Sequence, residues 1–189
     1  ASCGYALCIV DTGGSHSDLT DEYAAVRKEM ESVAAYLGKS VLREVDESEF
    51  VKNIADIRSS CGDRAVLRAM HFYGDNARVE KQAAALRAGD IKTFMKYIIE
   101  SGRSSYMYNQ NVYSCKKAAE QPVSLALSLS EKLLDGCGAW RVHGGGFAGT
   151  IQAFVPLNKL DEYKDLMEKV FGSGSCYVLS VRPVGGVEL

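Results

Sequence analysis

The residues best suited to chemistry form a glycine-dense turn in the last third of the sequence. Gly144, Gly145 and Gly146 are consecutive, and Gly149 follows shortly after them. A two-residue hairpin turn needs only one or two residues at positive φ, so four glycines indicate that something approaches the backbone closely or that several amides point one way. An anion-binding loop does both. A flexible surface turn explains the glycines as well, and the residues alone leave both interpretations open.

Two runs with the alternation of β-strands flank this turn. Before it, Trp140 and Val142 alternate with Arg141, and after it apolar and polar positions alternate over residues 151–155. The pattern predicts that the turn is the tip of a hairpin. His143 stands at the start of the turn, where it could donate to a phosphate or belong only to the hairpin, and we favour the second interpretation.

The remaining reactive side chains do not form a metal-binding pattern. Three histidines and six cysteines are scattered along the chain, without a Cys-x-x-Cys pair. They are His16, His71 and His143, and Cys3, Cys8, Cys61, Cys115, Cys137 and Cys176. We therefore expect reduced thiols, as in a cytoplasmic protein, and no metal site.

The charge balance excludes a strongly basic surface. Twenty-two Lys and Arg against 24 Asp and Glu give a formal net charge of -2, so no global field attracts the chain to nucleic acid or to an anionic membrane. No apolar run has the roughly 18 to 20 residues that a membrane span requires. The beginning of the sequence also lacks the pattern of an export signal.

The elements that must position the glycine turn can be predicted from periodicity and from capping residues. Residues 4–12 form an almost continuously apolar run, which predicts a strand buried on both faces. Thr20 or Asp21 is expected to cap the next helix, and the acidic segment Glu44–Glu49 is expected to be a solvated loop. Further helices are predicted over residues 20–37, 63–89, 90–98, 115–134 and 158–171, and a last strand over 175–182.

The predicted order of these elements is strand, helices, strand, strand, helix, strand. This order is that of the α+β, ferredoxin-like split β-α-β fold, with an extra helical block in its first crossover. No linker or repeat divides the sequence. We therefore expect a single domain over residues 1–189.

Two stretches in the same order along the chain resemble the galactokinases, a branch of the GHMP kinases. The first contains His16, Ser17, the pair Glu22-Tyr23 and Arg27, and the second is the loop from Arg141 to Gly149. The intervening helical block resembles the same family, so the resemblance extends over nearly the whole chain. The set is more specific than one glycine loop would be.

The resemblance implies that the chain is the C-terminal half of such a kinase, with the GHMP C-terminal type of ferredoxin-like fold. It implies ATP-dependent phosphorylation of the C1 hydroxyl of galactose or a near relative, with Mg²⁺ bridging the phosphates. The family carries its phosphate loop and its catalytic Asp and Arg in the N-terminal half, which is absent from this chain. The resemblance thus implies no catalytic residue here, an N-terminal half as partner, and an isolated chain without activity.

The resemblance also assigns roles to individual residues. Tyr23 matches the tyrosine whose hydroxyl contacts the sugar, and His16 matches a position near the cleft where a structural hydrogen bond is an equally good explanation. The residues that match the nucleotide loop are His143, Gly144, Gly145, Gly146, Phe147 and Gly149. His143 replaces the usual Thr and Ala148 the usual Gly, which leaves the identity of the sugar open.

One hypothesis from a different functional class remains. A ferredoxin-like module could bind a small molecule without catalysis, and the glycine loop would then border the ligand. A reading frame that continued upstream into a phosphate loop would favour the kinase, and a start codon just before Ala1 would favour the binding module. A GHMP kinase that acts on another sugar is a third alternative.

Overall fold

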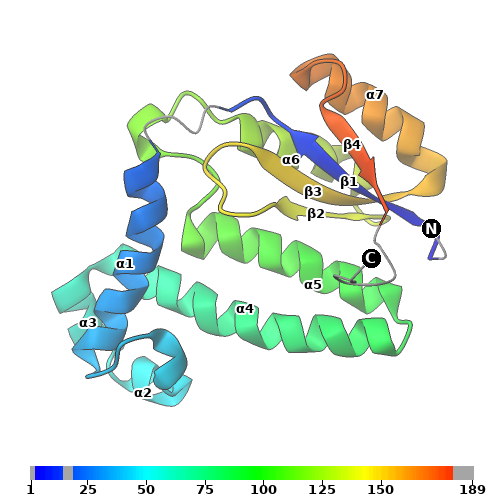
Figure 1. The fold of residues 1–189 in the computed structure, drawn as a ribbon. Helices are drawn as coiled ribbons and strands as arrows, with labels where there is room; N and C mark the ends of the chain where they lie inside the picture. Colours follow the sequence, from blue (N-terminus) through cyan, green and yellow to red (C-terminus); the bar gives the residue numbers. More distant parts are fainter. Residues whose placement is uncertain (1–2, 15–18, 181–189) are drawn as a thin grey trace, which may run out of the picture.

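The computed structural model describes residues 3–14 and 19–180, and its centre is a four-stranded sheet (Figure 1). The strands are β1 (Tyr5–Asp11), β2 (Ala139–Val142), β3 (Thr150–Pro156) and β4 (Cys176–Leu179). They lie in the order β2-β3-β1-β4, and every neighbouring pair is antiparallel. This is the strand order of the split β-α-β fold, so the predicted fold class is confirmed.

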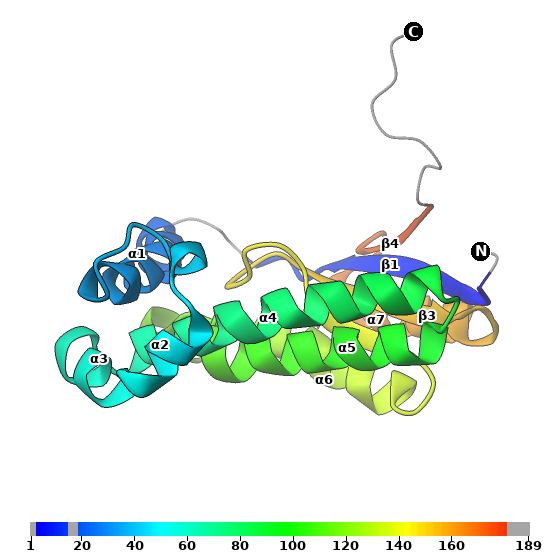
Figure 2. The same cartoon turned by 90° about the horizontal axis from the view of Figure 1, so that it is seen from below.

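The described residues form seven α-helices. They are α1 (Thr20–Tyr36), α2 (Glu47–Lys52), α3 (Ile54–Cys61), α4 (Asp63–Arg87), α5 (Ile91–Ser104), α6 (Pro122–Leu134) and α7 (Leu160–Phe171). Of these, α5, α6 and α7 contact the sheet. Helices α4 and α5 run side by side along the β2 edge of the sheet, and α1 leaves that pair at an angle (Figures 1 and 2). Among the described residues, no helix combines the length and the apolar character that a bilayer crossing demands.

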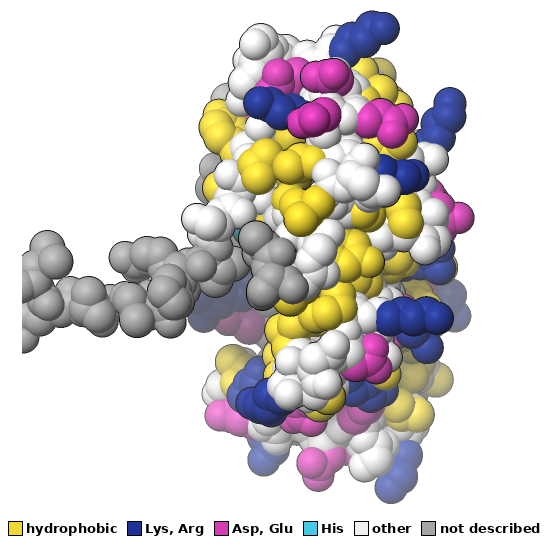
Figure 3. Space-filling view, turned by 90° about the vertical axis from the view of Figure 1, so that its right-hand side faces the viewer, with side chains coloured by type: hydrophobic (Ala, Val, Ile, Leu, Met, Phe, Trp, Pro, Cys, Tyr) yellow, Lys and Arg dark blue, Asp and Glu magenta, His cyan; other side chains and the backbone are white. Residues whose placement is uncertain are grey.

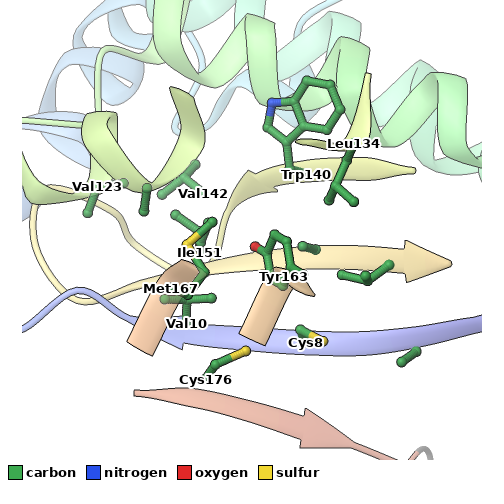
Figure 4. Close-up of a cluster of buried hydrophobic side chains, with 14 of the residues drawn as sticks. Cys8, Val10, Val123, Leu134, Trp140, Val142, Ile151, Tyr163, Met167 and Cys176 are labelled. Atoms are coloured by element: carbon green, nitrogen blue, oxygen red, sulfur yellow. The ribbon is translucent and has the colours of Figure 1, made fainter. Parts of the chain in front are cut away.

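The main core lies between the sheet and helices α6 and α7. Val10 and Ile151 from the sheet pack against Val123 of α6 and against Tyr163 and Met167 of α7 (Figure 4). All five side chains are buried. Burial of this much apolar surface fixes the two central strands, and these strands in turn fix both ends of the glycine turn.

The prediction that the first strand is buried on both faces is wrong. Cys8 and Val10 point into the core beneath α6 and α7, whereas Leu7 and Ile9 on the opposite face are only half-buried. The physical reason is that the sheet is antiparallel and packs its full helical layer on one face. The apolar run in the sequence could not distinguish this arrangement from a sandwiched strand.

The prediction of a solvated loop at Glu44–Glu49 is also wrong. A short 3₁₀ helix (Leu42–Glu44) is followed by α2 and α3, and these elements bury Leu42, Val45, Phe50 and Ile57. The four side chains form a second core with residues of α1 and the first half of α4. The acidic residues of the segment face outward. Because they dominate its composition, the sequence indicated a solvated loop and not the buried apolar set.

Other boundaries differ by a few residues. Asp90 caps α5 as its side chain accepts a hydrogen bond from the amide of Thr93 at 3.0 Å. Helix α6 begins at Pro122 rather than at Cys115, because Cys115–Lys117 form a separate 3₁₀ turn. At the start of α1, the N-cap is Leu19, and among the described residues no side chain caps the helix, so the predicted Thr20 or Asp21 cap is wrong.

A buried polar cluster joins α4 to α5. His71 Nδ1 lies 2.9 Å from Ser104 Oγ, and His71 Nε2 lies 4.0 Å from a carboxylate oxygen of Asp75. Asp75 also accepts hydrogen bonds from Ser101 Oγ at 2.6 Å and Arg78 Nε at 3.1 Å. Burial lowers the pKa of His71, and the nearby arginines 78 and 141 act in the same direction against the attraction of Asp75.

The lowered pKa of His71 predicts that the free energy of unfolding decreases as the pH is lowered. The unfolded state, with an ordinary imidazole pKa of about 6.5, binds a proton before the folded state does, so stability is lost as the pH drops below that value. One proton changes the free energy of unfolding by at most about 1.4 kcal/mol per pH unit. Urea unfolding at pH 7.5 and 5.5 should show a larger loss for the wild type than for His71→Gln. Equal losses in the two proteins would contradict the assignment.

Candidate functional site

The glycine turn is a seven-residue connection between β2 and β3, which confirms the predicted hairpin. Gly144, Gly146 and Gly149 have φ values of 68°, 81° and 97°, and Phe147 joins them at 58°. A side chain at such φ values is strained, so the backbone path itself requires several of the glycines. The loop is therefore a defined structure, held by the contacts described below, rather than an unrestrained turn.

The exposed part of the loop offers backbone donors. Gly144 and Gly145 are exposed, whereas Gly146, Phe147 and Gly149 are buried. Within the described part of the chain, the amides of Gly144 and Gly145 donate no hydrogen bond. Two adjacent unpaired amides on an exposed turn can bind an anion.

Tyr23, near the start of α1, lies directly against the loop. Its hydroxyl donates to the carbonyl oxygen of Gly146 at 2.7 Å, and its ring contacts Phe147 edge to face with 5.3 Å between centroids. A Cβ atom on Gly145 would lie 2.8 Å from the Tyr23 ring, so a glycine is needed there for close approach. The structure thus brings together two stretches that the sequence singled out separately. Burial raises the pKa of Tyr23, so its hydroxyl stays protonated and able to donate.

A third stretch, around Asn111, also contacts the loop, and the sequence did not indicate this. The backbone oxygen of Asn111 accepts a hydrogen bond from the amide of Phe147 at 2.6 Å, and Asn111 Nδ2 donates to the oxygen of Gly145 at 3.2 Å. A Cβ on Gly146 would lie 1.8 Å from the Asn111 oxygen. The only signal in the sequence was a short polar run, Asn109–Asn111, directly before an apolar residue.

Two more hydrogen bonds tie these stretches to the fold. Glu22 Oε1 accepts from Ser114 Oγ at 2.8 Å, and both side chains are buried. Thr12, just after β1, donates from its hydroxyl to the Gly149 oxygen at 2.6 Å and from its amide to the same oxygen at 2.9 Å. Both ends of the site are therefore fixed by the sheet and by α1.

The two histidines predicted near the site have different outcomes. His143 is exposed, and its Nδ1 lies 3.1 Å from Gln152 Oε1 across the hairpin. This contact agrees with the favoured interpretation that His143 belongs to the hairpin. His16 lies outside the described residues.

The hollow beside Tyr23 is mostly apolar. It has a volume of about 470 Å³, and Tyr23 separates it from the glycine loop. Its wall is formed by Val26, Met30, Val41, Leu42 and Phe72, with charged groups of Arg27, Glu31 and Arg43 at its rim. A sugar needs many hydrogen-bonding partners, and this wall offers few. Across the described residues there is also no group of three or more His, Cys, Asp or Glu side chains that could hold a metal ion.

Comparison with known proteins finds similarity to galactokinases. No model of a known protein family matches the chain. The chain is 31% identical to the galactokinase of Homo sapiens over 175 residues, which are 93% of this chain and 42% of that protein. It is 25% identical to the galactokinase of Actinobacillus pleuropneumoniae serotype 5b over 164 residues, 87% of this chain and 41% of that protein.

A solved structure supports the fold. The structure is titled as a Lactococcus lactis galactokinase complexed with galactose, and it superposes with a TM-score of 0.68 at 22% identity. The match covers 93% of this chain and 45% of that one. The chain thus spans about two fifths of the length of the curated relatives it matches. The chain is thus similar to galactokinases, and the similarity extends over their C-terminal half.

Proposed function

We propose that the chain works as the C-terminal half of a galactokinase-like kinase that phosphorylates galactose at its C1 hydroxyl with ATP. The observation that supports this most directly is the hydrogen bond from Tyr23 to Gly146, which joins two motifs 123 residues apart in the sequence. A kinase needs its sugar and its phosphates in one place. A contact between the tyrosine matched to the sugar and the loop matched to the nucleotide meets that need.

The contribution of this chain is positioning. Phosphoryl transfer depends chiefly on alignment and on stabilisation of charge, and little covalent chemistry is left to the protein. The exposed amides of Gly144 and Gly145 fit a phosphate oxygen, so they would orient the nucleotide. ATP supplies the phosphoryl group when it is bound. As the resemblance implies, we propose that the companion half holds Mg²⁺.

The N-terminal half of the same kinase is the proposed partner. The relatives are more than twice as long as the part that this chain matches. The apolar wall beside Tyr23 supplies few polar contacts to a sugar, so the remaining contacts are assigned to that half. We propose a cytoplasmic kinase, since Cys8, Cys61, Cys115, Cys137 and Cys176 are all unbridged thiols.

The proposal predicts that the chain alone has no kinase activity. With ATP, Mg²⁺ and galactose, ADP release by the isolated chain should equal that of a buffer control. Co-expression with the companion half should restore turnover, and a panel of galactose, its 2-acetamido derivative and glucose would identify the sugar. Turnover by the chain alone would contradict the division of roles. A folded complex that phosphorylates none of these sugars would favour a non-catalytic binding module.

A further inference from the structure

We propose that Asn111 is a positioning residue of the nucleotide loop (residues 143–149), a role that the sequence alone did not indicate. The inference rests on the proposed function, because it concerns the same loop. Its geometric basis is that Asn111 holds the loop at two successive points. The side-chain amide donates to the Gly145 oxygen at 3.2 Å, and the backbone oxygen accepts from the Phe147 amide at 2.6 Å.

These two bonds fix the part of the loop that directly follows the exposed amides. A peptide unit is planar, so fixing the Gly145 carbonyl also fixes the plane that carries the amide of Gly146. The Phe147 amide belongs to the next peptide plane, between Gly146 and Phe147. Gly144 and Gly145 come directly before these two planes and are exposed, with their own amides unpaired within the described chain. Without the donor at Asn111, the Gly145 carbonyl loses this constraint, and the preceding peptide unit, which carries the Gly145 amide, is held less firmly.

Buried residues on both sides of Asn111 hold this segment against the rest of the fold. Val112, its neighbour, is 1% exposed and belongs to the main core. Two residues earlier, the oxygen of Asn109 accepts a hydrogen bond from the buried Arg68 at 3.1 Å. Two residues after Val112, Ser114 binds the buried carboxylate of Glu22. The segment is thus held on both sides of Asn111, so the loop is positioned against a rigid surface.

The side chain of Asn111 has a feature that lowers stability and that a residue with a purely structural role would lack. Asn111 is 4% exposed, and its Oδ1 has no hydrogen-bond partner among the residues that the structure describes. A buried acceptor without a partner is destabilising, and an apolar residue at this position would avoid the loss. If Asn111 is retained for its donor alone, its replacement should impair the function of the loop without lowering the stability of the fold.

The test uses two variants at Asn111 and a matched control. Asn111→Ala removes the donor and the unpaired acceptor together but keeps the backbone oxygen, and Asn111→Asp keeps the volume but replaces the donor by a second acceptor. Asn109→Ala is the control, because Asn109 is also buried, its Oδ1 is unpaired among the described residues, and no hydrogen bond is found there between its side chain and the loop. All variants are made both in this chain and in the complex with the companion half.

The first measurement is amide hydrogen exchange in the chain itself. Asn111→Ala should lose protection at Phe147 while its thermal midpoint stays equal to or above that of the wild type. Asn109→Ala should keep the protection at Phe147. Unchanged protection in Asn111→Ala would overturn the inference, whether or not the kinase proposal is correct. A lowered thermal midpoint with loss of protection throughout the chain would assign Asn111 a structural role instead.

The second measurement is kinetics in the complex. Loss of one hydrogen bond should lower kcat/KM for ATP by about tenfold and leave KM for the sugar unchanged. In the Asn111→Asp variant, kcat/KM for ATP should rise relative to that of the wild type as the pH falls, because a protonated carboxyl can donate to the Gly145 oxygen. A wild-type complex without activity would refute the proposed function alone. An active wild type with unchanged ATP kinetics in both variants would refute the role of Asn111.

Discussion

Gly146→Ala is expected to lower the free energy of unfolding by about 3 kcal/mol or more. Part of the loss, about 1–2 kcal/mol, comes from placing a side chain at φ 81°. The remainder comes from the new Cβ, which would lie 1.8 Å from the Asn111 oxygen, so the backbone of one of the two stretches must move. Such overpacking costs about 1–3 kcal/mol. The movement also breaks the hydrogen bond from Phe147 to Asn111 and disturbs the one from Tyr23 to Gly146.

Gly144→Ala is the matched control for this prediction. Gly144 has a similar φ of 68°, but nothing lies within 4 Å of the position its Cβ would take. Its loss should therefore be the backbone strain alone, about 1–2 kcal/mol. Urea unfolding of the wild type and both variants gives the two differences. Equal losses would mean that Asn111 does not lie as close to Gly146 as described.

Arg68→Met is expected to lower the free energy of unfolding by about 3 kcal/mol. The guanidinium is 1% exposed, and it donates to Glu29 Oε2 at 2.8 Å and to the Asn109 oxygen at 3.1 Å. Burial lowers the pKa of Arg68, which reflects the loss of its hydration. Removing one member of a buried pair leaves its partners unsatisfied, and such losses are about 3–5 kcal/mol. Glu29 keeps a second arginine, so we expect the lower end.

Arg64→Met provides the comparison at the same carboxylate. Arg64 donates to Glu29 Oε1 at 2.6 Å, but its side chain is 43% exposed. An exposed ion pair contributes about 1 kcal/mol or less. Chemical denaturation of both variants distinguishes the effect of burial on the free energy of unfolding from the effect of the N–O distance, because the less buried pair has the shorter distance. A larger loss for Arg64→Met would show that pairing distance, rather than desolvation, sets the energy here.

The strands and the glycine turn could be predicted from the sequence because their signals are local. Alternation within 140–142 and 151–155 needs no knowledge of the rest of the chain, and it correctly identified the hairpin. The apolar run at 4–12 correctly indicated a strand but not its burial. Burial depends on which helices cover the sheet, and that is decided by residues far away in the sequence.

The support beneath the loop could not be predicted for the same reason. Asn111 meets Gly145 across 34 positions, and Tyr23 meets Gly146 across 123. No periodicity relates such pairs. The second core was missed for a different reason, since Leu42, Val45, Phe50 and Ile57 are dispersed among acidic residues over a 3₁₀ helix and its C-cap, α2 and α3. The packing of these elements on α1 and α4 makes the four side chains neighbours.

The position of β4 at the sheet margin has a practical consequence for work with the chain alone. Within the described residues β4 pairs only with β1, and Tyr177, Val178 and Leu179 are 51%, 48% and 47% exposed. Apolar side chains also reach the surface between charged ones on the side of the molecule that Figure 3 presents. An edge strand with exposed apolar side chains is a template for intermolecular pairing and aggregation. Solubility of the separated chain should therefore limit its concentration in solution, and Val178→Lys would be a first remedy.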